Sequence, residues 1–152
     1  MNQKSTRIVE LGIGTGGRTT AILRLAARFS PEATLHYTGI DLFEARTEKD
    51  GPGMRLKDAH RMLQMPGVKA QLVPGDPFSA LARMANSLPA TDLILISKCQ
   101  DHESLEKAWF YVPRMLHDRS IVLQEKADGT GFEEVARSVI AARASVTGRR
   151  AA

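Results

Sequence analysis

Short apolar runs alternate along the chain with longer segments in which apolar residues recur every three or four positions. The short runs are rich in Val, Ile, Leu and Thr, and they predict five strands: 7–11, 34–40, 68–73, 91–97 and 120–124. The longer segments predict five helices: 17–29, 54–65, 78–88, 102–116 and 132–144. Strands that alternate with helices are typical of an open parallel sheet covered on both faces. The pattern therefore predicts an α/β fold, a doubly wound three-layer sandwich.

Two prolines refine the predicted helices. Asp76-Pro77 precedes the third helix, and proline is tolerated in a first helical turn because its missing N–H would have no partner there. Pro113 falls inside the fourth helical pattern, where it predicts a kink or a break near Tyr111. Because no linker or internal repeat is visible, we expect a single domain over residues 1–145 and a basic, flexible tail at 146–152.

The composition is that of an ordinary globular protein, since 43% of the 152 residues are apolar and 25% are charged. No apolar run approaches the roughly 20 residues that cross a bilayer, and the first residues lack the apolar core of a secretion signal. Cys99 is the single cysteine, so an internal disulfide cannot form, which suits a reducing compartment. These features predict a cytoplasmic protein that has no membrane partner.

The net charge of +4, with arginines concentrated towards the C-terminus, is the feature that best suits a nucleic-acid partner. Aromatic residues make up only 5% of the chain and do not alternate with the basic ones, so no platform for stacking bases is visible. We therefore expect these arginines to form a solvated helix face rather than a nucleic-acid surface.

The most informative motif lies between the first predicted strand and the first predicted helix. There an acid leads into a row of glycines: Glu10-Leu11-Gly12-Ile13-Gly14-Thr15-Gly16-Gly17. Glycines allow a tight turn and let a ligand approach the backbone where a Cβ would collide. The N–H groups of such a turn, followed by a helix N-terminus, commonly bind a nucleotide-like group. The motif predicts a small-molecule cofactor site.

Acidic residues also lie at or beside the ends of the first three predicted strands, at Glu10, Asp41 and Asp76. In a doubly wound sheet, ligands bind beyond the carboxyl ends of the strands, where the strand order reverses. The three carboxylates are therefore expected to converge on one crevice beside the glycine turn. A carboxylate that accepts hydrogen bonds from two hydroxyl groups suits the ribose of a nucleoside.

The order and spacing of these motifs resemble those of the class I S-adenosylmethionine-dependent methyltransferases over about residues 7–125. Residues 10–16 are similar to the first motif of that family, an acid leading into GxGxG. Residues 37–41 resemble the second motif, residues 73–77 the third, and residues 91–97 the family's fourth strand. The order and spacing of these motifs together carry the resemblance.

The resemblance implies S-adenosylmethionine as the cofactor of a small methyltransferase with the strand order 3-2-1-4-5. It also implies that Asp41 accepts hydrogen bonds from the ribose hydroxyls and that Asp76 accepts one from the adenine amine. The implied cofactor-binding residues are Glu10, Gly12, Gly14, Gly16, Asp41, Leu42, Asp76, Pro77 and Ser97. The sequence pattern lacks the sixth and seventh strands usual in the family, so it predicts a minimal core, and it does not identify the methyl acceptor.

Each acid also has a structural interpretation that stays open. Glu10 could pair with Arg7 or accept from backbone N–H groups near the turn. Asp41 could simply end its strand, and Asp76 could cap the following helix, with or without an adenine contact.

Two other functions also stay open. Gly12, Gly14 and Gly17 satisfy the GxGxxG pattern of dinucleotide sites, which an NAD(P)-dependent Rossmann enzyme would use. A non-catalytic module or subunit that binds S-adenosylmethionine or a nucleotide is the second alternative. The acids Glu10 and Asp76 favour the methyl donor, because a dinucleotide site has less use for either.

Candidates for chemistry lie just after the fourth predicted strand, at Lys98, Asp101 and His102. His102 or Asp101 could take a proton from the methyl acceptor, and Lys98 could orient an acidic one. Asp101 also suits the N-cap of the next helix. In the loop after the second strand, Arg46 could hold an anionic group. The four histidines are scattered without zinc-ligand spacing, and nothing in the sequence requires the Mg²⁺ site that Asp101 could form with another acid, so no metal is predicted.

The fifth predicted strand, 120–124, would leave an apolar sheet edge without a neighbour. Exposed edges of this kind pair readily with another chain. The sequence therefore predicts a homodimer, or a partner subunit, that is joined through the edge of the fifth strand.

Overall fold

A computed structural model describes residues 5–151 and contains one sheet in the order β3-β2-β1-β4-β5-β6. The strands are β1 (Ser5–Leu11), β2 (Thr34–Asp41), β3 (Val68–Pro74), β4 (Thr91–Ile96), β5 (Leu116–Glu125) and β6 (Phe132–Glu134). The helices are α1 (Gly17–Phe29), α2 (Leu56–Met62), α3 (Pro77–Met84), α4 (His102–Ala108) and α5 (Arg137–Ala151). All pairs from β3 to β5 are parallel, which confirms the predicted doubly wound fold and the order 3-2-1-4-5.

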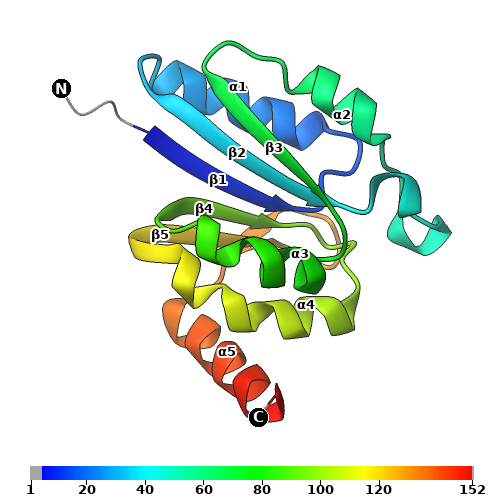
Figure 1. The fold of residues 1–152 in the computed structure, drawn as a ribbon, viewed down its shortest axis with the longest axis vertical. Helices are drawn as coiled ribbons and strands as arrows, with labels where there is room; N and C mark the ends of the chain where they lie inside the picture. The colour runs from blue at the N-terminus through cyan, green and yellow to red at the C-terminus, as the bar shows by residue number, and fades with distance from the viewer. Residues whose placement is uncertain (1–4, 152) are drawn as a thin grey trace.

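The sheet lies between two layers of helices. Figure 1 shows α1 and α2 over one face and α3, α4 and α5 over the other. The chain passes from β1 outwards to β3 on one side and from β4 outwards on the other, so the strand order reverses between β1 and β4. This is the switch point at which ligands bind in doubly wound sheets.

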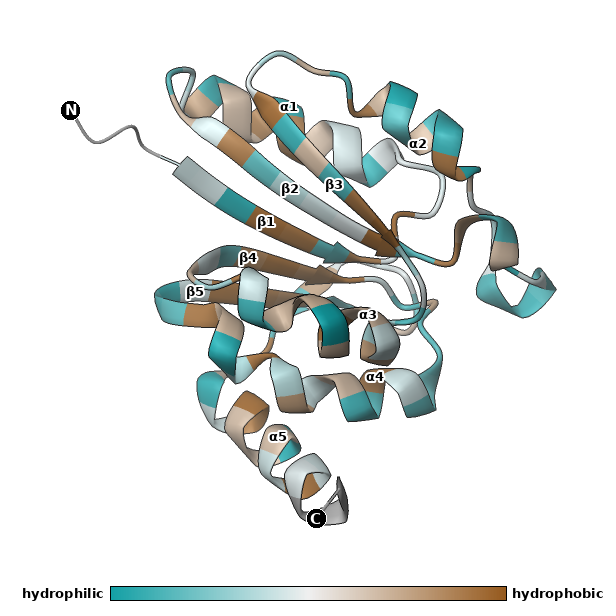
Figure 2. Ribbon diagram, in the orientation of Figure 1, coloured by the Kyte–Doolittle hydropathy of each residue, from teal (hydrophilic) through white to brown (hydrophobic). Residues whose placement is uncertain are grey.

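The core fills both interfaces between the sheet and its helices. Figure 2 shows apolar residues concentrated on the central strands, whereas the helices carry both polar and apolar residues. On one side Leu23 of α1 packs with Ile8, Leu35 and Tyr37, and on the other Trp109 packs with the cluster beneath α3 and α4. Helices anchored on both faces hold the strand ends in register, and that register positions the candidate site.

The prediction that no sixth strand follows β5 was wrong for the described residues 5–151. β6 pairs antiparallel with the end of β5, and Glu125 lies opposite Phe132. The chain reverses through Gly129 and Gly131, whose φ angles of 75° and 152° suit glycine. The Lys126 N–H donates to the Gly131 carbonyl over 2.8 Å and closes this hairpin.

The helix ends also differ from the predicted ones. The segment predicted as a helix over 132–144 begins as β6, and α5 starts only at Arg137 and continues to Ala151. Pro113 breaks the fourth helix, as predicted, because α4 ends at Ala108 and two short 3-10 turns follow, Trp109–Tyr111 and Pro113–Met115.

Candidate functional site at the strand ends

The glycine turn connects the end of β1 to the start of α1 at the switch point. Gly12 and Gly16 have φ angles of 92° and 86°, a left-handed backbone that side chains other than glycine rarely adopt. The Gly12 N–H donates to the Ile40 carbonyl over 2.7 Å, and the Ser97 N–H donates to the Leu11 carbonyl over 2.9 Å. The turn is therefore tied to the ends of both strands that flank β1.

Asp41, at the end of β2, is buried and accepts five hydrogen bonds. Three come from the backbone N–H groups of Ile13 (2.7 Å), Gly14 (3.1 Å) and Phe43 (2.9 Å). The other two come from the Arg46 guanidinium, whose Nε lies 2.7 Å from Oδ1 and whose Nη2 lies 2.6 Å from Oδ2. Burial alone raises the pKa of the Asp41 carboxyl, but hydrogen bonds from Arg46, Phe43 and Gly14 outweigh it and lower that pKa.

Arg46 is a site residue whose partner the sequence did not reveal. The sequence suggested that it holds an anionic group, and in the structure that anion is Asp41 of the same chain. Its Nη1 also donates to the carbonyls of Asp50 (2.6 Å) and Pro52 (3.2 Å). In the sequence, Asp41 and Arg46 are an acid and an arginine five residues apart at the start of a loop. That spacing alone does not show that the loop turns back and brings the two side chains together.

Glu10 has no exposed surface, and both of its oxygens are paired. Oε1 accepts from the Thr19 hydroxyl over 2.5 Å and from the Tyr37 hydroxyl over 2.6 Å, and Oε2 accepts from Arg18 Nε over 3.0 Å. Arg7 donates elsewhere, to the Ser87 carbonyl. Glu10 therefore supports the glycine turn from behind, by joining β1, β2 and α1.

Asp76 caps the N-terminus of α3, as one of its two interpretations predicted. Its Oδ2 accepts from the Ser79 N–H over 3.2 Å and also from the Ser104 hydroxyl of α4. Ser104 Oγ in turn accepts from the Phe78 N–H over 3.0 Å. Burial raises the pKa of Asp76, but the hydrogen bonds from Ser104 and Ser79 outweigh it and lower the pKa. The bridge holds α3 and α4 together at the rim of the crevice.

The strand ends enclose a narrow crevice of about 20 Å³. That volume is close to the space that one water molecule needs. Side chains of the protein pack closely against the glycine turn beside this crevice. A Cβ on Gly12 would collide with Gln100, and a Cβ on Gly16 would collide with Met62. The residues that line the crevice are Gly12, Asp41, Leu42, Arg46, Asp50, Gly75, Asp76, Pro77, Cys99, Gln100 and Asp101.

Five of the nine predicted cofactor-binding residues thus line one crevice, namely Gly12, Asp41, Leu42, Asp76 and Pro77. The remaining four lie around it or behind it. Ser97 accepts weakly from the Cys99 N–H, at 3.5 Å, while Gly14 and Gly16 belong to the glycine turn and Glu10 lies beneath it.

An open hollow of about 450 Å³ adjoins the crevice and shares Asp50, Cys99, Gln100 and Asp101 with it. The three residues proposed for chemistry, Lys98, Asp101 and His102, all line this hollow. Asp101 is already engaged, because its carboxylate accepts from the Ser104 N–H over 2.9 Å as the N-cap of α4. Lys98 and His102 are exposed to solvent.

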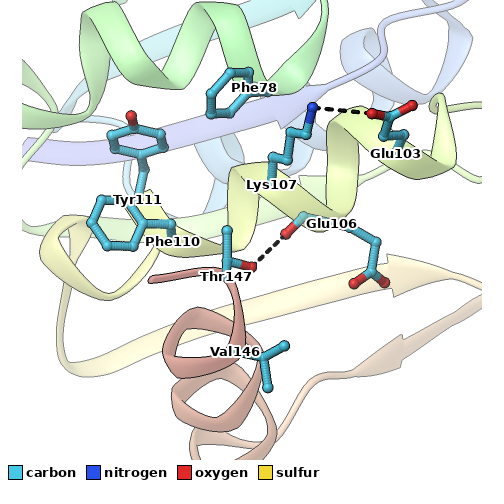
Figure 3. A pocket seen from close by; sticks show the side chains of 8 residues that line it. All are labelled: Phe78, Glu103, Glu106, Lys107, Phe110, Tyr111, Val146 and Thr147. Atoms are coloured by element: carbon cyan, nitrogen blue, oxygen red, sulfur yellow. Dashed lines mark hydrogen bonds and ion pairs between the residues drawn. The ribbon is translucent and has the colours of Figure 1, made fainter. Parts of the chain in front are cut away.

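A separate groove of about 400 Å³ runs between α3, α4 and α5, on the helical layer rather than at the strand ends. Figure 3 shows the rings of Phe78, Phe110 and Tyr111 along this groove, with Lys107 paired to Glu103 at its side. It is bounded by helix surfaces alone and includes neither the glycine turn nor the strand-end acids. We therefore place the candidate site at the strand ends.

Within residues 5–151, no group of three or more His, Cys, Asp or Glu side chains is arranged to hold a metal ion. Among the described helices, none is long and apolar enough to span a membrane.

The sheet order, the glycine turn and the acids at the strand ends define a Rossmann-like α/β protein with its site at the switch point. Solved structures with a similar arrangement of strands and helices are known. MNMC2 from Aquifex aeolicus matches with a TM-score of 0.60 and 12% identity, over 83% of this chain and 44% of that one. A TehB-like SAM-dependent methyltransferase from Corynebacterium glutamicum matches with a TM-score of 0.50 and 17% identity, over 97% of this chain and 67% of that one.

These matches confirm the fold, which is that of the class I S-adenosylmethionine-dependent methyltransferases. No protein-family model matches the sequence, and no curated protein does. The chain spans less than half the length of the Aquifex structure. At identities of this order, the comparison supports the arrangement of the strands and helices rather than a particular reaction.

Proposed function

We propose that this chain binds S-adenosylmethionine at the strand ends and transfers its methyl group to a separate acceptor molecule. The observation that carries the proposal is the convergence of the glycine turn, Asp41 and Asp76 on one crevice at the switch point of this fold. The residue types fit an adenosine group, since they comprise two carboxylates that accept hydrogen bonds and a glycine turn between them. The crevice must widen to admit it, because its present volume is about 20 Å³.

Each residue has a role in this proposal. Asp41 would accept hydrogen bonds from the ribose hydroxyls, and Asp76 would face the adenine amine beside Pro77. When bound, the cofactor supplies an electrophilic methyl group: a lone pair of the acceptor forms the new bond as the carbon–sulfur bond breaks and its electron pair stays on sulfur. The chain contributes mainly by placing the two reactants in line.

The acceptor would occupy the hollow that adjoins the crevice, since the two share Asp50, Cys99, Gln100 and Asp101. His102 lies on this hollow with an exposed imidazole and would take the proton that the acceptor loses. Lys98, on the same hollow, would orient an acidic acceptor. The Asp101 carboxylate is less available for this role, because it already caps α4.

Parallel titration calorimetry with S-adenosylhomocysteine and with NAD(H) tests the cofactor. We expect S-adenosylhomocysteine to bind. We also expect Asp41→Ala to weaken its binding by roughly tenfold or more, because hydrogen bonds to a carboxylate contribute roughly 1.5–3 kcal/mol each. Binding of NAD(H) instead would favour the dinucleotide alternative. Equal affinity of the Asp41→Ala variant would contradict the ribose assignment.

Transfer of a labelled methyl group from the cofactor to components of a cell extract tests the reaction. We expect label in an acceptor with the wild-type chain and much less with His102→Gln, whereas Lys57→Gln, an exposed lysine of α2, serves as a surface control. Cofactor binding without any label transfer would favour the non-catalytic binding module.

A further inference from the structure

We propose that Arg46 is a latch on the cofactor site, because its guanidinium holds in the free protein the same carboxylate oxygens that a ribose would need. This inference rests on the proposed function, in which Asp41 receives the ribose hydroxyls. It adds a contact within the chain that competes with the ligand.

The first argument is the capacity of the carboxylate. An ionised carboxylate offers about four lone-pair sites. Asp41 already accepts from five N–H groups, two of them on Arg46. A hydroxyl donor can therefore bind only where another donor leaves. The three backbone donors are fixed by the glycine turn and by the end of β2, so the guanidinium is the donor that can move.

The second argument is the set of contacts that Arg46 makes on its other side. Its Nη1 donates to the carbonyls of Asp50, Gly51 and Pro52, so the same side chain that holds Asp41 also closes the following loop. Within that loop, Asp50 accepts from the Thr47 N–H over 2.8 Å and from the Thr47 hydroxyl over 3.0 Å. The loop is thus a small self-bonded unit that Arg46 fastens over the crevice.

The third argument is the fit of Gly53. A Cβ on this residue would collide with the Cδ of Arg46 and approach its Nε to 2.5 Å. Gly53 does not have a left-handed backbone, so alanine can adopt its conformation. The absence of a side chain at Gly53 therefore allows Arg46 to lie where it does. An alanine at position 53 would therefore displace the Arg46 side chain from Asp41, although both residues keep their identity.

In the released state, Asp41 keeps its three backbone donors and gains acceptor capacity for hydroxyl groups. Removal of Arg46 also enlarges the crevice, since this side chain lines it and is itself mostly buried. The ligand's apparent affinity then depends on the fraction of molecules in which the latch is open.

The experiment compares wild type with Arg46→Gln, Arg46→Lys and Gly53→Ala. It uses Arg55→Gln as the control, because the Arg55 side chain forms an exposed pair with Asp58 away from Asp41. We measure S-adenosylhomocysteine affinity by calorimetry and amide hydrogen exchange over residues 43–53 in the free proteins. Circular dichroism establishes that each variant is folded.

We expect Arg46→Gln and Gly53→Ala to bind the nucleoside about 5- to 150-fold more tightly than wild type, the usual span of such a coupling. Their 43–53 amides should exchange faster without ligand, Arg46→Lys should lie between, and Arg55→Gln should match wild type.

Binding by Arg46→Gln that is equal to or weaker than that of wild type overturns the latch while leaving the cofactor assignment intact. Unchanged exchange in both latch variants also overturns it. If neither wild type nor any variant binds S-adenosylhomocysteine, the cofactor assignment is overturned. The proposed competition between Arg46 and the ribose for Asp41 is then overturned as well.

Discussion

The hydroxyl of Tyr37 donates a 2.6 Å hydrogen bond to Oε1 of Glu10 inside the protein, where neither side chain is appreciably exposed. This contact joins β1 to β2 directly beneath the glycine turn, and Arg18 and Thr19 of α1 complete the set of donors around the acid. Burial and the charge of Glu10 raise the pKa of Tyr37 well above its usual value, so the phenol keeps its proton and remains a donor. The turn thus rests on a buried, fully paired carboxylate.

The Tyr37 contact predicts a stability loss on removal of a single oxygen atom. Tyr37→Phe should lower the free energy of unfolding by about 1.5–3 kcal/mol, because the hydrogen bond is made to a buried charged group. Urea denaturation followed by circular dichroism measures this loss. Tyr111→Phe, at a half-buried ring of the opposite helical layer, is the control and should change the value by less than about 0.5 kcal/mol. Equal effects of the two variants would contradict this account.

Asp41 predicts a loss of stability in acid. Its pKa is lowered in the folded state, so the unfolded chain binds more protons, and the stabilisation is present above the ordinary value of about 3.9. That stabilisation is lost as the pH falls through the folded-state pKa. In Arg46→Gln, which lacks the strongest of the contacts that lower this pKa, the drop between neutral pH and about pH 3 should be smaller. Denaturant unfolding at both pH values tests this, and a drop as large as that of wild type would argue against it.

Ser104 predicts a coupling between α3 and α4. Its hydroxyl donates to Asp76 and accepts from the Phe78 N–H, so Ser104→Ala leaves both groups without that partner. We expect the free energy of unfolding to fall by about 1–3 kcal/mol and the pKa of Asp76 to rise. Thermal or urea unfolding measures the first effect, and NMR titration of the carboxyl measures the second. Ser138→Ala, on the exposed surface of α5, is the control, and an unchanged Asp76 pKa in Ser104→Ala would refute the bridge.

A partner joined through the edge of β5 stays a prediction. β6 pairs with Leu123–Glu125 of this edge, and Ile121 remains 43% exposed beside it. Sedimentation velocity over a wide concentration range should show self-association that Ile121→Lys weakens and that Leu25→Lys, on the exposed surface of α1, leaves unchanged. A monomer at every concentration would count against the homodimer.

Local patterns predicted the sheet well, because each strand carries its own apolar signature. β1 to β4 begin and end within two residues of the predicted positions. β5 begins four residues early, at Leu116, since a bulge lies between its first pair with β4 and the next. There the Ser120 hydroxyl donates to the Thr91 carbonyl over 2.5 Å, a contact that has no signal in the sequence. The start of α5 was misplaced because the apolar residues at 132 and 135 suit a strand as well as a helix.

The sequence by itself determined the order of strands and helices, the glycine turn and the acids at the strand ends, because each depends on residues that are adjacent or a few positions apart. Only the tertiary structure decided what those acids contact. Glu10 faces inwards because the packing of α1 on β2 encloses it with Thr19 and Tyr37. Asp41 meets Arg46 because the loop after β2 turns back over the crevice. Such pairings depend on the path of the chain through space, so the same residue types that suit a ligand are paired here within the protein.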